Sequence, residues 1–162
     1  MERTLLTLLF IGLVLIMFAL MRRGWHRSAL RAQDVIAPGP MFDSPIIAGP
    51  WSGRFLGTTR AQRWLDRVNA HSLGDRSMVA INVTAAGVNV VREGALSFGI
   101  PAADIIGVRA DSGIAGRAYG TAGIVVVTFR LGQDELEFGV RFPSTSDHIA
   151  ALAALASTEV SS

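Results

Sequence analysis

The longest hydrophobic stretch of the chain lies near its N-terminus. Residues 5–21 contain no charged side chain, and apolar residues fall on every face of a helix drawn through them, a pattern typical of burial in lipid or in a large core. At about 1.5 Å per residue such a helix is roughly 25 Å long, close to the lower limit for crossing a bilayer. Trp25 follows, where an interfacial aromatic residue is common. We predict a transmembrane span at about residues 4–21, within an anchor segment of residues 1–31.

The charges that flank this stretch predict its orientation. Four arginines follow it closely: Arg22, Arg23, Arg27 and Arg31. The cytoplasmic flank of a membrane helix usually holds the excess of positive charge. The four arginines therefore indicate a single-pass inner-membrane protein with its N-terminus outside and its C-terminal domain in the cytoplasm. The same arginines are candidate contacts with an anionic membrane surface. A cleaved signal peptide is the alternative, but the apolar run is long for one and lacks a small-residue cleavage site.

A proline- and glycine-rich segment separates this anchor from the rest of the chain. Its prolines are incompatible with a continuing helix or a central strand, so residues 32–50 are interpreted as a semi-ordered linker. Four of its side chains are apolar enough to pack on the domain or on a partner: Met41, Phe42, Ile46 and Ile47.

Beyond the linker, the pattern changes to short strands. Alternating or β-branched runs predict about seven of them, at residues 51–59, 77–84, 88–92, 96–101, 104–111, 123–131 and 136–142. The run 123–131 is the richest in β-branched residues and should be central. In the last strand, Leu136 and Phe138 should point inward, and Glu137 and Arg141 should share the outer face.

Two helices complete the prediction. Thr59 and Gln62 resemble a capping box, which would open a short helix with an apolar stripe over residues 61–68. At the C-terminus, Ser144 and Asp147 supply an N-cap signal for an alanine-rich helix. Its apolar stripe is Ile149, Leu152 and Leu155, and it should cover an open end or edge of the sheet. Residues 159–162 form a tail.

Composition removes several functional classes. The chain has no cysteine, which excludes disulfides, cysteine nucleophiles and thiolate metal sites. The net charge is only +2 and all fifteen basic residues are arginine, so no concentrated basic surface favours nucleic-acid binding. The three histidines show neither metal-ligand spacing nor a nucleophile motif. No cofactor or metal is expected, and no catalytic residue is predicted.

The order of strands followed by a C-terminal helix resembles a pleckstrin-homology-like (PH-like) domain. The chain is similar to small actinobacterial membrane proteins that join one N-terminal anchor to a bacterial PH-like domain. The residues that support this resemblance are GRFLGTT (53–59), WLDRVNAHSLGDR (64–76), IPAADIIGVRADSGIAGRAYG (100–120) and IVVVTFRLG (124–132). It implies a β-sandwich or partly open barrel with a capping helix over residues 51–158. It implies no catalytic residues, and PH-like domains elsewhere bind lipid headgroups or proteins.

Two groups of residues are candidate ligand contacts. The loop 112–123 holds four glycines that can form a backbone nest for a phosphate, with Arg117 as the counter-charge; a flexible loop between strands is the alternative, and the more frequent one. Arg60, Arg63 and Arg67 have helical spacing and could bind an anionic headgroup; a solvated helix face is the alternative, and the favoured one.

These observations favour a non-enzymatic, membrane-anchored interaction module that serves as a scaffold or accessory subunit and binds a protein partner. The alternative function is binding of anionic lipid or phosphate headgroups through Arg60, Arg63, Arg67 and Arg117.

Overall fold

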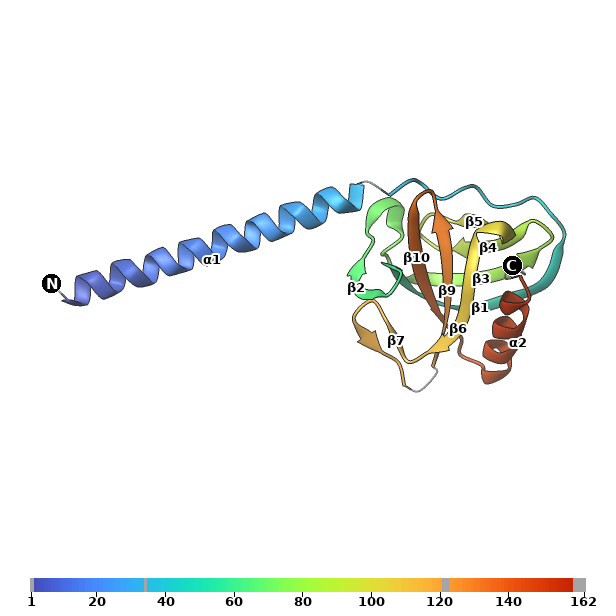
Figure 1. Ribbon diagram of the computed structural model, residues 1–162. Helices are drawn as coiled ribbons and strands as arrows, with labels where there is room; N and C mark the ends of the chain where they lie inside the picture. Colours follow the sequence, from blue (N-terminus) through green and yellow to red (C-terminus); the bar gives the residue numbers. More distant parts are fainter. Residues whose placement is uncertain (1, 34, 121–122, 159–162) are drawn as a thin grey trace. The chain divides into compact units, whose positions relative to one another are not determined.

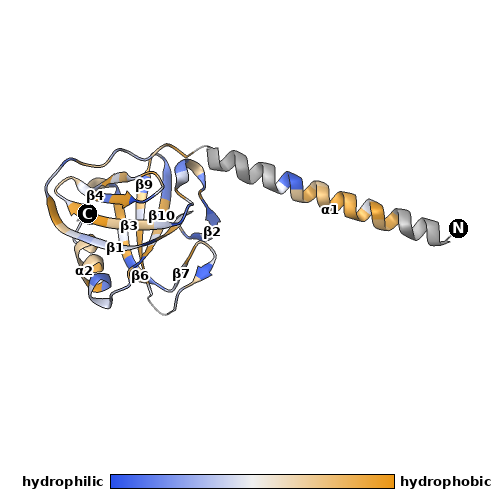
Figure 2. Ribbon diagram, turned by 180° about the vertical axis from the view of Figure 1, so that it is seen from behind, coloured by the Kyte–Doolittle hydropathy of each residue, from blue (hydrophilic) through white to orange (hydrophobic). Residues whose placement is uncertain are grey.

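The computed structural model describes residues 2–33, 35–120 and 123–158, and within the N-terminal helix it describes the side chains of residues 9–24. The chain divides into two units, Met1–Asp34 and Val35–Ser162. The first contains helix α1 (Glu2–Gln33). Its described side chains are apolar up to the two arginines at positions 22 and 23 (Figure 2).

The predicted membrane span is not found. Among the described residues, no helix has an apolar stretch of the length that a bilayer crossing requires. This finding contradicts the predicted location as a single-pass inner-membrane protein with a cytoplasmic domain.

The second unit is built on one antiparallel sheet with the strand order β5-β4-β3-β1-β10-β9-β6, in which β2 also pairs with β1 (Figure 1). The sheet is open and does not close into a barrel. Its strands are β1 (Ile46–Arg60), β2 (Arg63–Arg67), β3 (Ser77–Thr84), β4 (Gly87–Arg92), β5 (Phe98–Pro101), β6 (Ile105–Asp111), β9 (Ile124–Leu131) and β10 (Asp134–Arg141). A separate small hairpin joins β7 (Gly113–Ile114) to β8 (Arg117–Ala118). Two short 3-10 segments, Ala70–Ser72 and Ala102–Asp104, and the helix α2 (Thr145–Ala156) complete the unit.

The inner face of this sheet encloses an aromatic core. Four fully buried phenylalanines from four strands meet there with ring centroids 5.5–6.5 Å apart: Phe55, Phe98, Phe129 and Phe138. The inward positions of β10 follow the predicted alternation, because Leu136, Phe138 and Val140 are all buried in this core. Truncating one such phenylalanine typically costs about 3–5 kcal/mol, so this cluster is a main source of the domain's stability.

The short helix predicted after Thr59 is wrong. The chain instead turns back at Gln62, which has a φ of 61°, and forms a hairpin between β1 and β2. The Ala61 amide donates to the Glu135 carbonyl oxygen at 2.8 Å, and the Val68 amide donates to the Thr58 carbonyl oxygen at 2.9 Å. The buried Thr59 hydroxyl has no hydrogen-bond partner among the described residues and caps no helix. Long-range pairing has therefore displaced a local capping signal.

Residues 35–45 run along the domain as a strap. Val35 is buried in the core, and the Gly99 amide on β5 donates to the Gly39 carbonyl oxygen at 3.1 Å. The side chain of Asn89, on β4, binds the backbone of Phe42 at both ends: its Oδ1 accepts from the Phe42 amide at 2.8 Å, and its Nδ2 donates to the Phe42 carbonyl oxygen at 3.0 Å. The strap thus covers the otherwise free edge of β5, a position that would invite pairing with another chain.

Strand β1 begins at Ile46, inside the proline-rich segment, and it therefore contains Pro50. The pairing of β1 with β3 is irregular there, with register shifts between Ile46 and Ala48 and between Ala48 and Trp51. Proline within a sheet is confined to such irregular or edge positions because it has no amide hydrogen to donate. The irregular pairing explains how the strand extends beyond its predicted start.

The C-terminal helix is confirmed, and α2 packs against β6 and β9. Ser144 is its N-cap, and its Oγ accepts from the Asp147 amide at 3.3 Å. The buried positions are Ala151 and Leu155, whereas Ile149 is 62% exposed. Leu155 is therefore buried as predicted and Leu152 packs partly buried against the core, whereas Ile149 faces away and the smaller Ala151 lies against the sheet.

Candidate functional site

The outer face of the sheet has a small apolar cluster of its own. Leu56, Ile124 and Val126 point away from the phenylalanine core and are covered by Ile114 from the β7–β8 hairpin. Ile114 lies directly over Gly139, where an added Cβ would be 2.6 Å from its Cγ2. The hairpin therefore rests on a flat part of the sheet that only glycine provides.

The β7–β8 hairpin also contacts β2. The Gly116 amide donates to the Trp64 carbonyl oxygen at 3.1 Å, and Arg67 donates weakly from Nη2 to the Ala115 carbonyl oxygen at 3.4 Å. These bonds join two segments that are about fifty residues apart in the chain. Together they form one side of a cavity.

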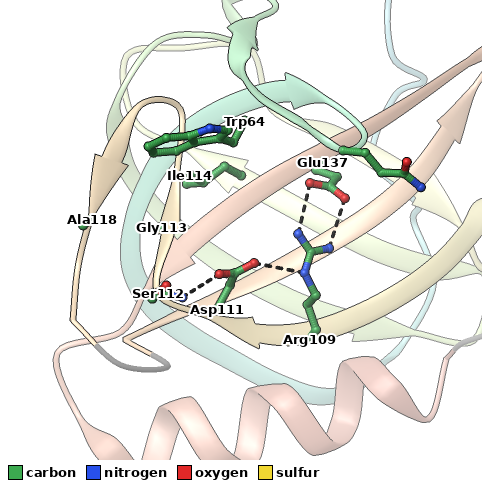
Figure 3. A pocket seen from close by; sticks show the side chains of 9 residues that line it. Trp64, Arg109, Asp111, Ser112, Gly113, Ile114, Ala118 and Glu137 are labelled. Carbon is green, nitrogen blue, oxygen red and sulfur yellow. Dashed lines mark hydrogen bonds and ion pairs between the residues drawn. The ribbon is translucent and has the colours of Figure 1, made fainter.

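This cavity, the Trp64 pocket, has a volume of about 380 Å³, which lies within the range of small-ligand sites. Figure 3 shows the Trp64 indole on one side, Ile114 beside it, and the Arg109–Glu137 pair with Asp111 on the opposite side. Six of the side chains that define the pocket are Gln62, Trp64, Arg109, Asp111, Ile114 and Glu137. The pocket thus combines an aromatic wall, an aliphatic wall and a charged floor.

The centre of the charged floor is a bidentate ion pair. Arg109, on β6, donates from Nη1 to Glu137 Oε1 at 3.0 Å and from Nη2 to Glu137 Oε2 at 3.1 Å. Thr128 Oγ1, on the intervening strand β9, donates to Glu137 Oε1 at 3.3 Å. Glu137 is only 5% exposed, and a buried carboxylate requires such compensation. The hydrogen bonds that Arg109 donates to Glu137 raise the pKa of Arg109, and burial opposes that effect.

Asp111 is the second carboxylate of the floor. Its Oδ2 accepts from Arg109 Nε at 3.1 Å, and its Oδ1 accepts from the Ser112 amide at 2.6 Å. Partial burial raises the pKa of Asp111, but the hydrogen bonds from the Ser112 amide and from Arg109 outweigh it, so the pKa lies below its usual value. Asp111 and Arg109 therefore both remain charged at neutral pH, and neither is tuned to exchange a proton there.

The four arginines predicted to bind an anion lie on three strands, β1, β2 and β8. Arg60 forms an ion pair with Asp134 and a second, longer one with Asp66, whose Oδ2 lies 3.8 Å from Arg60 Nε. Arg67 contacts the Ala115 carbonyl oxygen, whereas Arg63 and Arg117 are exposed on β2 and β8. The helical spacing that grouped the first three does not exist, because these residues lie on two strands of a hairpin. In α1, Arg22 and Arg23 are exposed, and the side chains of Arg27 and Arg31 lie outside the described residues.

The glycine-rich loop forms the β7–β8 hairpin, and residues 121 and 122 lie outside the described part. The Tyr119 amide donates to the Ser112 carbonyl oxygen at 2.6 Å, which closes the hairpin. At its start, the Ser112 amide donates to the carboxylate of Asp111 at 2.6 Å. This is an amide of the kind that a phosphate nest uses, and here an internal carboxylate engages it.

The two histidines whose side chains the structure describes, His71 and His148, make contacts in different parts of the domain. His71 Nε2 lies 3.0 Å from the Val35 carbonyl oxygen, and the His148 ring contacts Phe142; the side chain of His26 is outside the described residues. In the part of the chain that the structure describes, no group of three or more potential ligands is placed to hold a metal ion.

Sequence reasoning did not find the Trp64 pocket. Glu137 was assigned to the outer face of its strand, which is where it lies, but nothing local indicates that Arg109 reaches it across another strand. Trp64 was assigned to the buried stripe of a helix, whereas it is half-exposed. One signal is present in the sequence, because Arg109 and Asp111 stand two residues apart at the end of a strand and therefore share one of its faces.

The comparisons with known proteins agree with this architecture. A family described as bacterial PH domain-like matches residues 36–156, which covers the strap, the sheet and α2. No curated protein and no solved structure matches the chain.

Proposed function

The chain belongs to the bacterial PH domain-like family. We propose that it is a non-enzymatic protein-interaction module, a scaffold or accessory subunit. Its partner binds at the Trp64 pocket and the rim formed by the adjoining hairpins. Members of the same fold serve many functions, so the proposal has to be argued from the site and not from the fold.

The observation that supports the proposal best is the exposure of two large apolar neighbours, Trp64 (51%) and Leu65 (71%), beside a cavity. Tryptophan is the residue most enriched at the energetic centres of protein interfaces. The hairpin that presents it is held on β1 and on β7–β8, so a partner would pay little entropy to order it. Such a pre-organised apolar rim suits a protein ligand.

The chemistry of the pocket supports a binding role over a catalytic one. Its charged groups form hydrogen bonds with one another, and the pKa shifts of Arg109 and Asp111 both favour the charged forms. A general acid or base works best with a pKa near the operating pH. We also propose an actinobacterial origin for this chain, because its sequence resembles small actinobacterial membrane proteins with a bacterial PH-like domain.

The proposal is tested with purified full-length protein carrying an affinity tag, used to capture partners from the cells that produce it. We expect a stoichiometric partner that rebinds the purified chain, and that is lost when Trp64→Ser and Leu65→Ser are combined. Ile149→Ser is the matched control, because Ile149 is equally exposed but lies on α2. A partner that binds the double variant as well as the wild type would contradict the proposal.

A second candidate is binding of anionic lipid headgroups. It is favoured by the two exposed arginines, Arg63 and Arg117, on the same pair of hairpins as Trp64. Vesicles containing about 20% phosphatidylserine should then bind the chain at low salt and release it when salt shortens the Debye length below about 8 Å. Combined Arg63→Ala and Arg117→Ala should remove this binding, and Arg130→Ala, an exposed control on β9, should not.

A further inference from the structure

The floor of the Trp64 pocket contains more negative than positive charge. Two carboxylates, Asp111 and Glu137, share the single guanidinium of Arg109. The formal charge of the three groups is therefore −1 (1 − 2). All three line the same cavity, so this imbalance faces the space that a ligand would occupy.

The hydrogen bonds of the floor show the same excess of acceptors over donors. Arg109 has five N–H donors, and four are used within the described residues: Nε on Asp111, the two Nη1 hydrogens on Glu137 and Thr128, and one Nη2 hydrogen on Glu137. A carboxylate offers about four acceptor positions. Glu137 uses three of them, for two bonds from Arg109 and one from Thr128.

Asp111 is in a similar position, since it accepts one bond from Arg109 and one from the Ser112 amide. The floor is therefore left with acceptor capacity on both carboxylates and a single donor on Arg109. An incoming phosphate or carboxylate would find one N–H and face two like charges. An incoming cation would find two acceptors.

The walls of the pocket suit a cationic ligand that has an apolar stem. The Trp64 indole stands across the cavity from the carboxylates (Figure 3), and the face of an indole attracts a cation within about 6 Å. Ile114 and Ala118 supply aliphatic surface, against which the methylene stem of a long basic side chain can pack. The volume of about 380 Å³ is ample for one side chain.

We propose that the Trp64 pocket binds the cationic side chain of an arginine or lysine from the partner protein, with its charge between the indole of Trp64 and the carboxylates of Asp111 and Glu137. This inference rests on the proposed function, because it names the group of the partner that enters the pocket. Arg63, which precedes Trp64 on β2, alternates to the other side of its strand and can meet acidic residues that flank that side chain.

The test compares three small probes of one shape with different charge: n-butylguanidinium, n-butylurea and n-pentanoate. Two-dimensional ¹H–¹⁵N spectra of the full chain report on the Trp64 indole N–H and the Ser112 and Gly113 amides. We expect saturable shifts with the guanidinium alone, weakened by salt. Asp111→Asn should weaken that binding about three- to tenfold, and Glu93→Gln, an exposed acid outside the pocket, should leave it unchanged.

Equal shifts with butylurea, shifts with pentanoate, or no saturable shift with any probe would each overturn the inference. None of these results depends on the natural partner. If the Trp64→Ser/Leu65→Ser protein loses its partner while the probes fail, the proposed function stands and the cation assignment does not. If the probes bind as expected while the partner binds the double variant as well as it binds the wild type, the proposed function is at fault.

Discussion

Arg109 and Glu137 are joined across an intervening strand, with Nη1 3.0 Å from Oε1 and Nη2 3.1 Å from Oε2. Arg109 lies on β6, Glu137 on β10, and Thr128 of β9 lies directly opposite Glu137 in the β9–β10 register. The glutamate is buried and the arginine side chain is 46% exposed. The pair is thus asymmetric, and its two members should respond differently to mutation.

Removing Arg109 alone should lower the free energy of unfolding more than removing Arg109 and Glu137 together. Arg109→Leu leaves Glu137 buried without its cation, and we expect the free energy of unfolding to fall by about 2 kcal/mol, below the value for fully buried pairs because Arg109 is half-exposed. The double variant Arg109→Leu/Glu137→Leu should recover at least half of this loss. Denaturant titration of both variants measures the difference, with Arg130→Leu as an exposed control. Equal losses in the single and double variants would contradict this assignment.

Arg92 should be the arginine least tolerant of substitution. It is 5% exposed, lies 4.1 Å above the Phe55 ring, and donates to Ser77 Oγ and to the carbonyl oxygens of Ser72 and Asp75. Burial lowers its pKa and the charge of Asp75 raises it. Lysine cannot reproduce this fork, so Arg92→Lys should lower the free energy of unfolding by about 2–3 kcal/mol.

The exposed Arg76→Lys is the matched control for Arg92→Lys, and thermal and denaturant unfolding measure both. A loss below about 0.5 kcal/mol for Arg92→Lys, the size of an ordinary surface change, would show that the loop carbonyls do not depend on the guanidinium.

The strap can be displaced by a single methyl group. A Cβ at Gly99 would lie 2.6 Å from the Pro40 carbonyl oxygen and 2.9 Å from the Phe42 ring. Gly99→Ala should therefore loosen residues 35–45, with faster hydrogen exchange at the Phe42 amide and a loss of stability of about 1–3 kcal/mol. At Gly107 nothing lies within 4 Å of an added Cβ, so Gly107→Ala should leave that exchange rate unchanged. Unaltered protection of Phe42 in Gly99→Ala would contradict the contact.

Asp111 should make the free energy of unfolding of the domain depend on pH in the acidic range. Its pKa is lowered in the folded state, so its contribution is fully present above the pKa of the unfolded chain, about 3.9. This contribution is lost as the pH falls through the lowered folded-state pKa. Asp111→Asn should reduce stability at neutral pH and flatten its pH dependence below about pH 4. Asp43→Asn, an exposed control on the strap, should reproduce the wild-type slope.

Local patterns predicted most of the fold. The β-branched run of β9, the alternation of β10 and the Ser144 cap each follow from neighbouring residues, and each is present in the structure. The hairpin at β2 could not be predicted in this way, because the spacing of Ala61, Trp64, Leu65 and Val68 fits an amphipathic helix. What decides the matter is the pairing with β1, in which Gln62 takes a left-handed conformation. The strap was similarly hidden, since Asn89 recognises backbone atoms of Phe42 and not a side chain.

The candidate site was less accessible to sequence reasoning than the fold. Its components come from four separate segments, and the decisive contact, Arg109 to Glu137, joins strands that are not neighbours in the sheet. The predicted arginine group depended on a helix that is not formed. A prediction of sites in such a domain requires the strand order first.

The outer apolar cluster has a consequence for how the strands find their partners. Ile124, Val125, Val126 and Val127 of β9 are all almost completely buried, with alternate residues in the inner and outer clusters. Their volumes are so similar that a shift of one residue against β10 would exchange the two sets with little loss of buried area, and one-sided burial, which normally fixes register, gives little discrimination here. The shift would, however, separate Thr128 from Glu137. The alignment of this run of interchangeable valines is therefore set at its end, where Phe129 must face the inner core and Thr128 must meet Glu137. A chain in which Phe129 is replaced by valine and both Thr128 and Glu137 are made apolar should populate more than one alignment of the same two strands.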